Sequence, residues 1–546
     1  MISAVSWVPR GAARAVPLVT EVKPQELEAL KQRLERQVVL GDDADSDAAG
    51  SVSEESAEMH DSDLEAGDAV ARARAAAATL KGSRSGKSRS HAGASDAAGS
   101  IEAAMQELDM DNYDEPDPEA HGNLVMRAMG GKLAIAPGDD PYLTLGDSED
   151  DSDEVEDLTL KPTDLLILAA RNEDDVSNLE VWVYEEAEAL GDEANVYVHH
   201  ELVLPAFPLC LAWLDLSPAG ADPSLHGNFV AIGSMEPGIE IWDLDVIDGV
   251  EPVAVLGGED KAGTAAAAAA ARQEAIEAAE AGGDGKLDKK KKKKLRTKLK
   301  KKSTGPVYKP GSHQGPVLGL SWNPEYRNVL ASGSADHTVK VWDVSCCSVA
   351  HSLTHHSDKV QAVAWNPAEP QVLLTGGFDK LAALVDVRQP SAQELRWSLS
   401  ADVEALAWSP HQPTQFLVSS EDGLVACFDA RMGQGAAPLF RLEAHSKPAC
   451  ALAFSPGARG LLATGSTDKH TKLWDISTGA PALIVSQDLQ VGAIFTMGFC
   501  PDAPHLLAMG GAKGAVTVWD VRASEAVASK FPALLEASPK QVVGTG

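Results

Sequence analysis

Two stretches of the chain repeat one set of side chains whose types could do chemistry. Each stretch holds a histidine, a hydroxyl residue, an acid and a tryptophan, with the histidine 29, the hydroxyl 10 and the acid 6 residues before the tryptophan. The two sets are His313, Ser332, Asp336 and Trp342, and His445, Thr464, Asp468 and Trp474. A histidine held by an acid can activate a hydroxyl as a nucleophile, so this spacing invites a hydrolytic interpretation.

Both sets belong to a longer repeat, and the repeat favours another role. An aspartate closes a short apolar strand at five regular positions, in steps of 43, 43, 46 and 45 residues: Asp343, Asp386, Asp429, Asp475 and Asp520. Each unit opens with an apolar residue followed five positions later by an aromatic, as in Val317 and Trp322. A period of about 40–45 residues with four strands and a closing Trp-Asp is typical of a WD-repeat β-propeller blade.

Within such a blade the four side chains are expected to be structural. The acid orients the histidine, the histidine reaches the hydroxyl, and the hydroxyl reaches the indole N–H, so each buried polar group is paired. Three other units keep the set only in part, since Val385 replaces a tryptophan, Val418 a hydroxyl and Lys513 an acid. We therefore predict no catalytic residue and no enzymatic activity, and we expect the incomplete blades to rely more on packing.

The repeat predicts an all-β fold, a seven-bladed WD-repeat β-propeller with a long acidic disordered N-terminal insertion and a lysine-rich insertion. Ile2 and Trp7 have the spacing of Val317 and Trp322, so the first residues are expected to begin a blade that is completed much later. The predicted parts are 1–10 as the inner strand of the first blade, 11–160 as an acidic, mostly disordered insertion, 161–257 as blades 1 and 2, 258–310 as an Ala/Glu-rich and Lys-rich insertion, 311–530 as blades 3 to 7, and 531–546 as a tail.

Several functional classes find no support in the sequence. The run from Gly82 to Ser88 resembles a phosphate-binding loop, but it has three residues between its glycines instead of four and follows no predicted strand. None of the six cysteines stands in a C-x-x-C arrangement, and no apolar run reaches the length of a membrane helix. We expect a soluble intracellular protein with no cofactor, no metal, no membrane contact and no small-molecule substrate.

Charge is strongly segregated along the chain, whose formal net charge is −34. Residues 41–157 hold 30 acidic and 8 basic residues, whereas residues 286–302 hold 12 basic residues and one acid. A basic run of this density is typical of nuclear import and of contact with a phosphate backbone. It lacks the aromatic residues that would stack on bases, so base-specific RNA recognition is not expected. Its main residues are Lys289, Lys290, Lys291, Lys292, Lys293, Lys294, Arg296, Lys298, Lys300, Lys301 and Lys302.

The acidic arm has three interpretations that the sequence leaves open. It could bind basic ribosomal proteins or histones, fold onto the chain's own lysines, or act only as a solubilising segment. Ser148 is followed by a run of acids and is a candidate site for an acidophilic kinase.

Beyond the repeat, specific segments resemble the periodic tryptophan protein 1 family of WD-repeat proteins. They include Val196-Tyr-Val-His-His200, Ile239-Glu-Ile-Trp-Asp-Leu-Asp245 and Asp140-Pro-Tyr-Leu-Thr-Leu145, and the acidic and lysine-rich insertions come in the same order. The resemblance implies a nuclear, largely nucleolar factor in ribosome biogenesis, linked to large-subunit precursor rRNA processing, to rRNA gene transcription and to chromatin. Its expected partners are proteins of pre-ribosomal particles, pre-rRNA through the lysine tract, and histones.

A different class of function is a substrate receptor for a cullin-type ubiquitin ligase. Such receptors often carry an arginine two residues after the Trp-Asp aspartate, and Arg388, Arg431 and Arg522 stand at that position. A histone-binding chromatin module is a further alternative.

Overall fold

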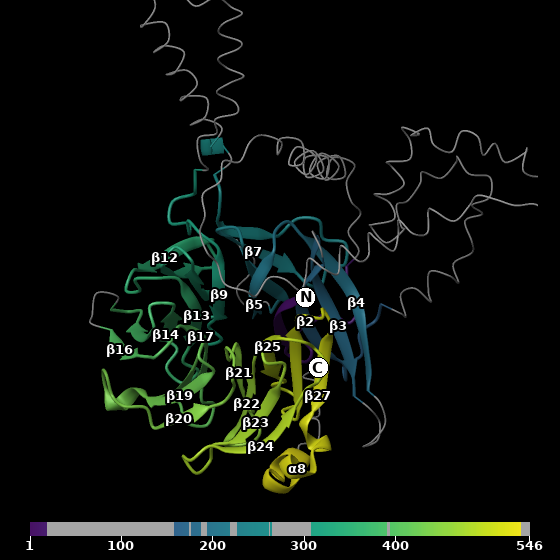
Figure 1. Ribbon diagram of the computed structural model, residues 1–546. Helices are drawn as coiled ribbons and strands as arrows, with labels where there is room; N and C mark the ends of the chain where they lie inside the picture. Colours follow the sequence, from purple (N-terminus) through teal and green to yellow (C-terminus); the bar gives the residue numbers. More distant parts are fainter. Residues whose placement is uncertain are drawn as a thin grey trace, which may run out of the picture. The chain divides into compact units, whose positions relative to one another are not determined.

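Short apolar strands joined by tight turns form seven antiparallel sheets in the computed structural model, which confirms the predicted β-propeller (Figure 1). The structure describes residues 1–18, 158–173, 176–186, 194–218, 226–260, 262–264, 307–389 and 394–536. The predicted acidic arm and the lysine tract lie outside these residues. Each sheet is one blade, and its strands are numbered outward from the centre of the ring.

Strands with the same place in a blade share a burial pattern. The innermost strands are β1 (Ile2–Val8), β5 (Pro208–Leu214), β9 (Val317–Trp322), β13 (Val360–Trp365), β17 (Val403–Trp408), β21 (Ala451–Phe454) and β25 (Ile494–Phe499). The second strands are almost wholly buried and are β2 (Leu165–Glu173), β6 (Phe229–Ser234), β10 (Val329–Ser334), β14 (Val372–Gly377), β18 (Gln415–Ser420), β22 (Leu461–Gly465) and β26 (Leu506–Gly511).

The third strands end in the recurring aspartate, and the fourth are the shortest and most exposed in several blades. The third strands are β3 (Val176–Glu185), β7 (Gly238–Asp243), β11 (Val339–Asp343), β15 (Leu381–Asp386), β19 (Leu424–Asp429), β23 (Thr471–Asp475) and β27 (Val516–Asp520). The fourth are β4 (Asn195–Leu204), β8 (Ala254–Gly257), β12 (Ser348–Leu353), β16 (Leu395–Ser398), β20 (Phe440–Glu443) and β24 (Ala482–Gln487).

The N-terminal strand closes the ring. β1 pairs with β2, although more than 150 residues of sequence separate them, and it supplies the innermost strand of blade 1. β1 also packs against β5 of blade 2 and β25 of blade 7, so the first and last blades meet at this strand. The closure therefore joins the two ends of the described chain through one strand of seven residues.

The core lies between neighbouring blades, where a glycine of one blade often admits a branched side chain of the next. A Cβ on Gly333 would lie 2.9 Å from Val360 Cγ1, and a Cβ on Gly510 would lie 2.8 Å from Ile2 Cβ. Side chains cannot approach this closely, so glycine at these places sets the spacing of the blades. The second contact lies at the closure itself.

Blade 7 differs from the four-stranded unit that the repeat predicts. Among the described residues it has only three strands, because the chain after β27 turns into the 3₁₀ helix η3 (Val521–Ala523) and the helices α8 (Glu525–Lys530) and α9 (Ala533–Glu536). Val527, Phe531 and Leu534 of this segment are buried in the cluster between blades 6 and 7. A similar short turn, η2 (Ala430–Met432), follows β19 in blade 5.

Candidate functional site

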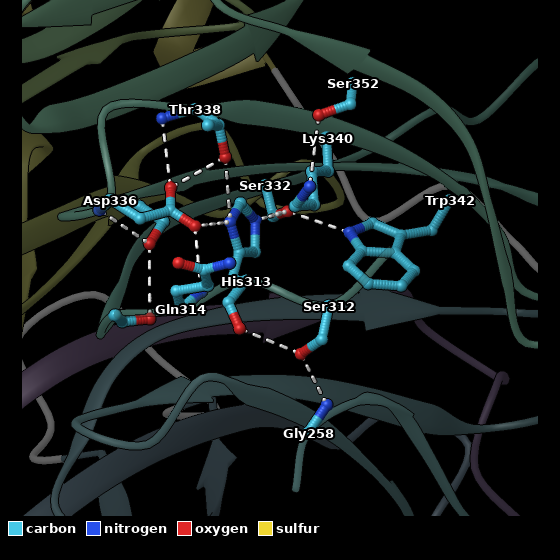
Figure 2. Close-up of polar contacts among 12 residues, drawn as sticks. Gly258, Ser312, His313, Gln314, Ser332, Asp336, Thr338, Lys340, Trp342 and Ser352 are labelled. Atoms are coloured by element: carbon cyan, nitrogen blue, oxygen red, sulfur yellow. Dashed lines mark hydrogen bonds and ion pairs between the residues drawn. The ribbon is translucent and has the colours of Figure 1, made fainter. Parts of the chain in front are cut away.

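The first predicted set comes together in blade 3 as a chain of hydrogen bonds (Figure 2). His313 Nδ1 lies 2.9 Å from Asp336 Oδ2, and His313 Nε2 lies 2.7 Å from Ser332 Oγ. The Trp342 indole N–H donates to the same Ser332 oxygen at 2.8 Å. Asp336 also accepts hydrogen bonds from the backbone of Gln314 and from Thr338, which fixes the turn between β10 and β11.

This arrangement has the connectivity of a hydrolytic triad but cannot act as one. Ser332 has no exposed surface, so no substrate can reach its oxygen. The hydroxyl is also held between the histidine and the indole, which leaves its oxygen engaged by the Trp342 N–H. Burial lowers the pKa of His313, and it opposes ionisation of Asp336. Hydrogen bonds from His313 and Thr338 outweigh that cost and hold the pKa of Asp336 below its usual value.

The second set has the same geometry in blade 6. His445 Nδ1 lies 2.9 Å from Asp468 Oδ2, and its Nε2 lies 2.8 Å from Thr464 Oγ1. Trp474 Nε1 donates to that threonine oxygen at 3.0 Å, and Thr464 is fully buried. In the structure the four side chains of each set are therefore hydrogen-bonded to one another and connect the turns and strands of their own blade. We call such a hydrogen-bonded set a tie.

Blade 4 contains a histidine whose role the sequence did not reveal. His355 Nε2 and His356 Nε2 both lie within hydrogen-bond distance of Thr375 Oγ1, at 2.8 and 2.9 Å. In blades 3 and 6 the second partner of this hydroxyl is the indole, which blade 4 lacks because Val385 stands there. Burial and the neighbouring His356 lower the pKa of His355 to about 4. The doubled histidine beside a missing tryptophan was the only signal in the sequence.

Each of the three arginines that follow the recurring aspartate forms bidentate hydrogen bonds with that aspartate. The Nε and NH2 groups of Arg431 lie 3.0 and 2.6 Å from the two carboxylate oxygens of Asp429. Arg388 on Asp386 and Arg522 on Asp520 repeat this pairing. The side chain of Arg431 is 71% exposed, whereas that of Arg522 is only 22% exposed. The arginines thus lie in three separate blades and do not gather into one site.

The lysine tract and Ser148 lie outside the described residues, but the chain on either side of the lysine-rich insertion is described. The Asp260 N–H donates to the Val307 carbonyl at 2.7 Å, and the Lys309 N–H donates to the Gly258 carbonyl at 3.0 Å. Ser312 Oγ accepts from the Gly258 N–H and donates to the His313 carbonyl (Figure 2). The root of this insertion is therefore hydrogen-bonded to the complete tie of blade 3.

The acidic arm has its root on the opposite face of the ring. Leu18 donates to the Asp245 carbonyl and accepts from the Ile247 N–H, and Leu160 donates to the Ala15 carbonyl. This arm connects the first and second strands of blade 1, whereas the lysine-rich insertion connects the fourth strand of blade 2 to blade 3. In an antiparallel blade those two kinds of connection lie at opposite ends of the strands. The two roots are thus separated by the thickness of the ring.

The described residues contain no group of His, Cys, Asp or Glu side chains suited to a metal ion. Within the same residues no helix is long and apolar enough to cross a membrane. The thiols of Cys427 and Cys500 are buried, whereas that of Cys346 is exposed.

Comparison with known proteins places the chain among WD-repeat proteins. The family model for the WD domain, G-beta repeat, matches residues 305–343, 347–386 and 436–475. The chain is 36% identical to an uncharacterised WD repeat-containing protein of Schizosaccharomyces pombe, over 97% of this chain and 91% of that protein. It is 30% identical to periodic tryptophan protein 1 of Saccharomyces cerevisiae, over 98% of this chain and 90% of that protein. A shorter match, 50% identical over 9% of this chain and 12% of its partner, is a ribosome biogenesis protein WDR12 homolog of Nematostella vectensis.

Proposed function

The chain belongs to the periodic tryptophan protein 1 family of WD-repeat proteins, and from that premise we propose that it is a non-enzymatic scaffold in nucleolar ribosome biogenesis. The scaffold acts in large-subunit pre-rRNA processing, in rRNA gene transcription, or in both. Its location is the nucleus and chiefly the nucleolus, and its partners are proteins of pre-ribosomal particles. The similarity to a relative named for ribosome biogenesis supports this proposal.

One structural observation carries it: two insertions of opposite charge are rooted on opposite faces of one ring. Backbone hydrogen bonds hold both roots, at Leu18 and Asp245 for the acidic arm and at Asp260 and Val307 for the basic one. A scaffold needs separate surfaces for separate partners, and a propeller supplies rigid faces and loops for them. The acidic arm recruits basic proteins, and the lysine tract contacts the phosphate backbone of pre-rRNA and directs nuclear import.

The buried ties support the proposal that the scaffold is non-enzymatic. The hydroxyls that could serve as nucleophiles, Ser332 and Thr464, are fully buried and hydrogen-bonded to indoles. Their histidines hold loops in place and have no path to a substrate.

Affinity purification separates protein docking from RNA tethering. The experiment compares the wild-type chain with a deletion of residues 286–302, each with and without RNase. We expect the deletion to lose the RNase-sensitive partners and to keep the RNase-resistant ones. Depletion of the protein should alter precursor rRNA profiles and lower large-subunit levels. Unchanged profiles and levels would refute the role in ribosome biogenesis.

The ligase-receptor alternative rests on the exposed arginines. Arg388 and Arg431 lie at the same turn of neighbouring blades, with side chains 64% and 71% exposed. A ligase adaptor recovered with the wild-type chain and lost with Arg431→Ala would favour this alternative, and the absence of any adaptor would remove it. The histone-binding alternative predicts capture of histones that depends on the acidic arm and is insensitive to RNase.

A further inference from the structure

A small pocket lies between blades 1 and 2 at the root of the acidic arm, where Pro17 and Leu160 are part of its lining. Its walls are mostly apolar and come from both blades, with Val8 and Leu166 in blade 1 and Leu244 in blade 2. The space left free holds about one water molecule. Any ligand of the pocket is therefore small and has to match the few polar groups that line it.

Two adjacent histidines of β4 line this pocket, and their hydrogen bonds determine where their protons are. His199 Nε2 lies 2.9 Å from the carbonyl oxygen of Leu158, which can only accept, so this nitrogen carries a proton. A neutral imidazole has one N–H, so His199 Nδ1 is then an acceptor. His200 Nδ1 lies 2.9 Å from it and must donate. In the neutral pair the remaining nitrogen, His200 Nε2, is therefore a bare acceptor.

This bare nitrogen is buried and lacks a donor. His200 is only 8% exposed, and its Nε2 has no hydrogen-bond partner in the described part of the chain. Burial, with a smaller contribution from His199, lowers the pKa of His200 to about 4, so the ring is neutral at neutral pH. A buried acceptor without a donor destabilises the folded chain, because it has given up its hydrogen bond to solvent. A donor is therefore expected in the pocket beside it.

The same pocket contains an acid that can accept one more hydrogen bond. Asp245 Oδ1 accepts from the Arg14 backbone N–H at 3.1 Å and from Asn228 Nδ2 at 3.0 Å, and Asp245 Oδ2 lies 3.5 Å from Arg14 Nε. A carboxylate has about four acceptor positions, so Oδ2 can take a further donor. The Arg14 side chain, which is 59% exposed, supplies N–H donors at the same place.

A ligand with two donors and one acceptor matches these groups, and water has that pattern at the right size. Its two O–H groups can donate to His200 Nε2 and Asp245 Oδ2, while its oxygen accepts from Arg14. An anion is disfavoured because it would place further acceptors against a bare nitrogen and a carboxylate. A metal ion is disfavoured because the described residues hold no group of three His, Cys, Asp or Glu side chains suited to one.

We propose that this pocket is a binding site for one ordered water molecule, held by His200 Nε2 and Asp245. The water completes a chain of hydrogen bonds that runs from the Leu158 carbonyl through both histidines to Asp245. The backbone carbonyl of Asp245 in turn accepts from the Leu18 N–H. The described residues on either side of the acidic arm are thus connected across two blades. This inference is independent of the proposed role in ribosome biogenesis.

NMR of the full chain with isotope-labelled histidine tests the proton positions. At about pH 8, above the ordinary histidine pKa of about 6.5, we expect the proton of His199 on Nε2 and that of His200 on Nδ1. If His200 carried its proton on Nε2, the pocket would face a donor instead of an acceptor, and the proposal would be wrong. This measurement uses the wild-type chain and does not depend on the folding of a variant.

Magnetic relaxation dispersion of water tests the ligand itself, because it counts the water molecules that stay bound while the protein tumbles. We expect His200→Leu, which removes the acceptor, to have one long-lived water fewer than the wild type. His226→Gln, at a histidine whose side chain is 77% exposed, is the matched control and should keep the wild-type number. An unchanged number in His200→Leu, or an equal loss in both variants, would overturn the proposal.

Discussion

Blades 3 and 7 occupy equivalent places in the ring but are held by different forces. At three positions that carry the polar tie of blade 3, blade 7 has Gln490, Met509 and Lys513. Met509 is fully buried in the apolar cluster between blades 6 and 7, and Lys513 Nζ lies 3.4 Å from Gln490 Oε1 at the surface. Blade 3 is thus fixed by a buried hydrogen-bond network, whereas blade 7 depends on packing against its neighbours.

The difference shows that one backbone can be held in two ways. A buried polar network must be fully paired, because a single unpaired group costs about 1–3 kcal/mol. A packed apolar blade tolerates polar changes at its surface but is sensitive to lost volume. Substitutions that separate these two sensitivities therefore test the comparison.

The largest effect is expected at the seam between blades 7 and 1. Ile2 is fully buried against Gly510, and Ile2→Ala removes side-chain volume that closes the ring. We expect a loss of about 2–5 kcal/mol in the free energy of unfolding, measured by chemical denaturation. Val16→Ala, at a valine that is 50% exposed on the same N-terminal segment, is the control and should cost less than about 0.5 kcal/mol. A seam variant as stable as the control would show that packing does not hold blade 7 in the ring.

A smaller but clear effect is expected when the polar tie of blade 3 is broken. In the wild type the Asp336 carboxylate accepts a hydrogen bond from His313 Nδ1 at 2.9 Å. Asp336→Asn replaces the carboxylate with an amide, which offers this nitrogen either an N–H₂ donor or a weaker acceptor. The free energy of unfolding is expected to fall by about 1–3 kcal/mol, which lowers the melting temperature. No defined activity is expected to be lost. Asp468→Asn in blade 6 should behave alike, because its geometry is the same. If the Asp336→Asn protein melted at the wild-type temperature, the tie would not stabilise blade 3.

The three units that sequence comparison detects all keep the histidine–aspartate pair of the tie. The WD-repeat model matches three units, and these contain the pairs His313 with Asp336, His356 with Asp379, and His445 with Asp468. The other four blades could be predicted only from strand spacing, because packing leaves a weak pattern of exchangeable apolar residues. The spacing nevertheless led to the right number of blades and to the confirmed fold.

Some features depend on contacts that spacing does not encode. The sharing of Thr375 by His355 and His356 requires the path of the turn before β13, which no repeat position specifies. Among the described residues blade 7 has three strands, because the chain after β27 buries Val527 and Phe531, two apolar residues in a short polar segment that resembles a tail. Both features arise from tertiary packing and have no periodic signal.

Acid should weaken the blades in which burial lowers the pKa of a histidine, such as His355 in blade 4 and His505 in blade 7. Burial lowers the pKa of His355 from 6.5 to about 4, so between these values the unfolded chain binds a proton that the folded chain does not. Stability is therefore lost as the pH falls from about 6.5 toward 4. His355→Gln keeps a donor near Thr375 and should reduce the slope of unfolding free energy against pH in this window. His226→Gln, at an exposed histidine, is the control, and an equal change in both variants would assign the slope elsewhere.

The smallest effect is expected in blade 7 at the position that corresponds to Asp336. The side chain of Lys513 makes one long hydrogen bond, to Gln490 at the surface, whereas Asp336 is bonded to the buried His313. Lys513→Met should change the free energy of unfolding by less than about 0.5 kcal/mol, in contrast to Asp336→Asn. The measurement is the difference between the two variants under identical denaturation conditions. If Lys513→Met cost as much as Asp336→Asn, blade 7 would depend on a polar tie after all, and the contrast between the two blades would fail.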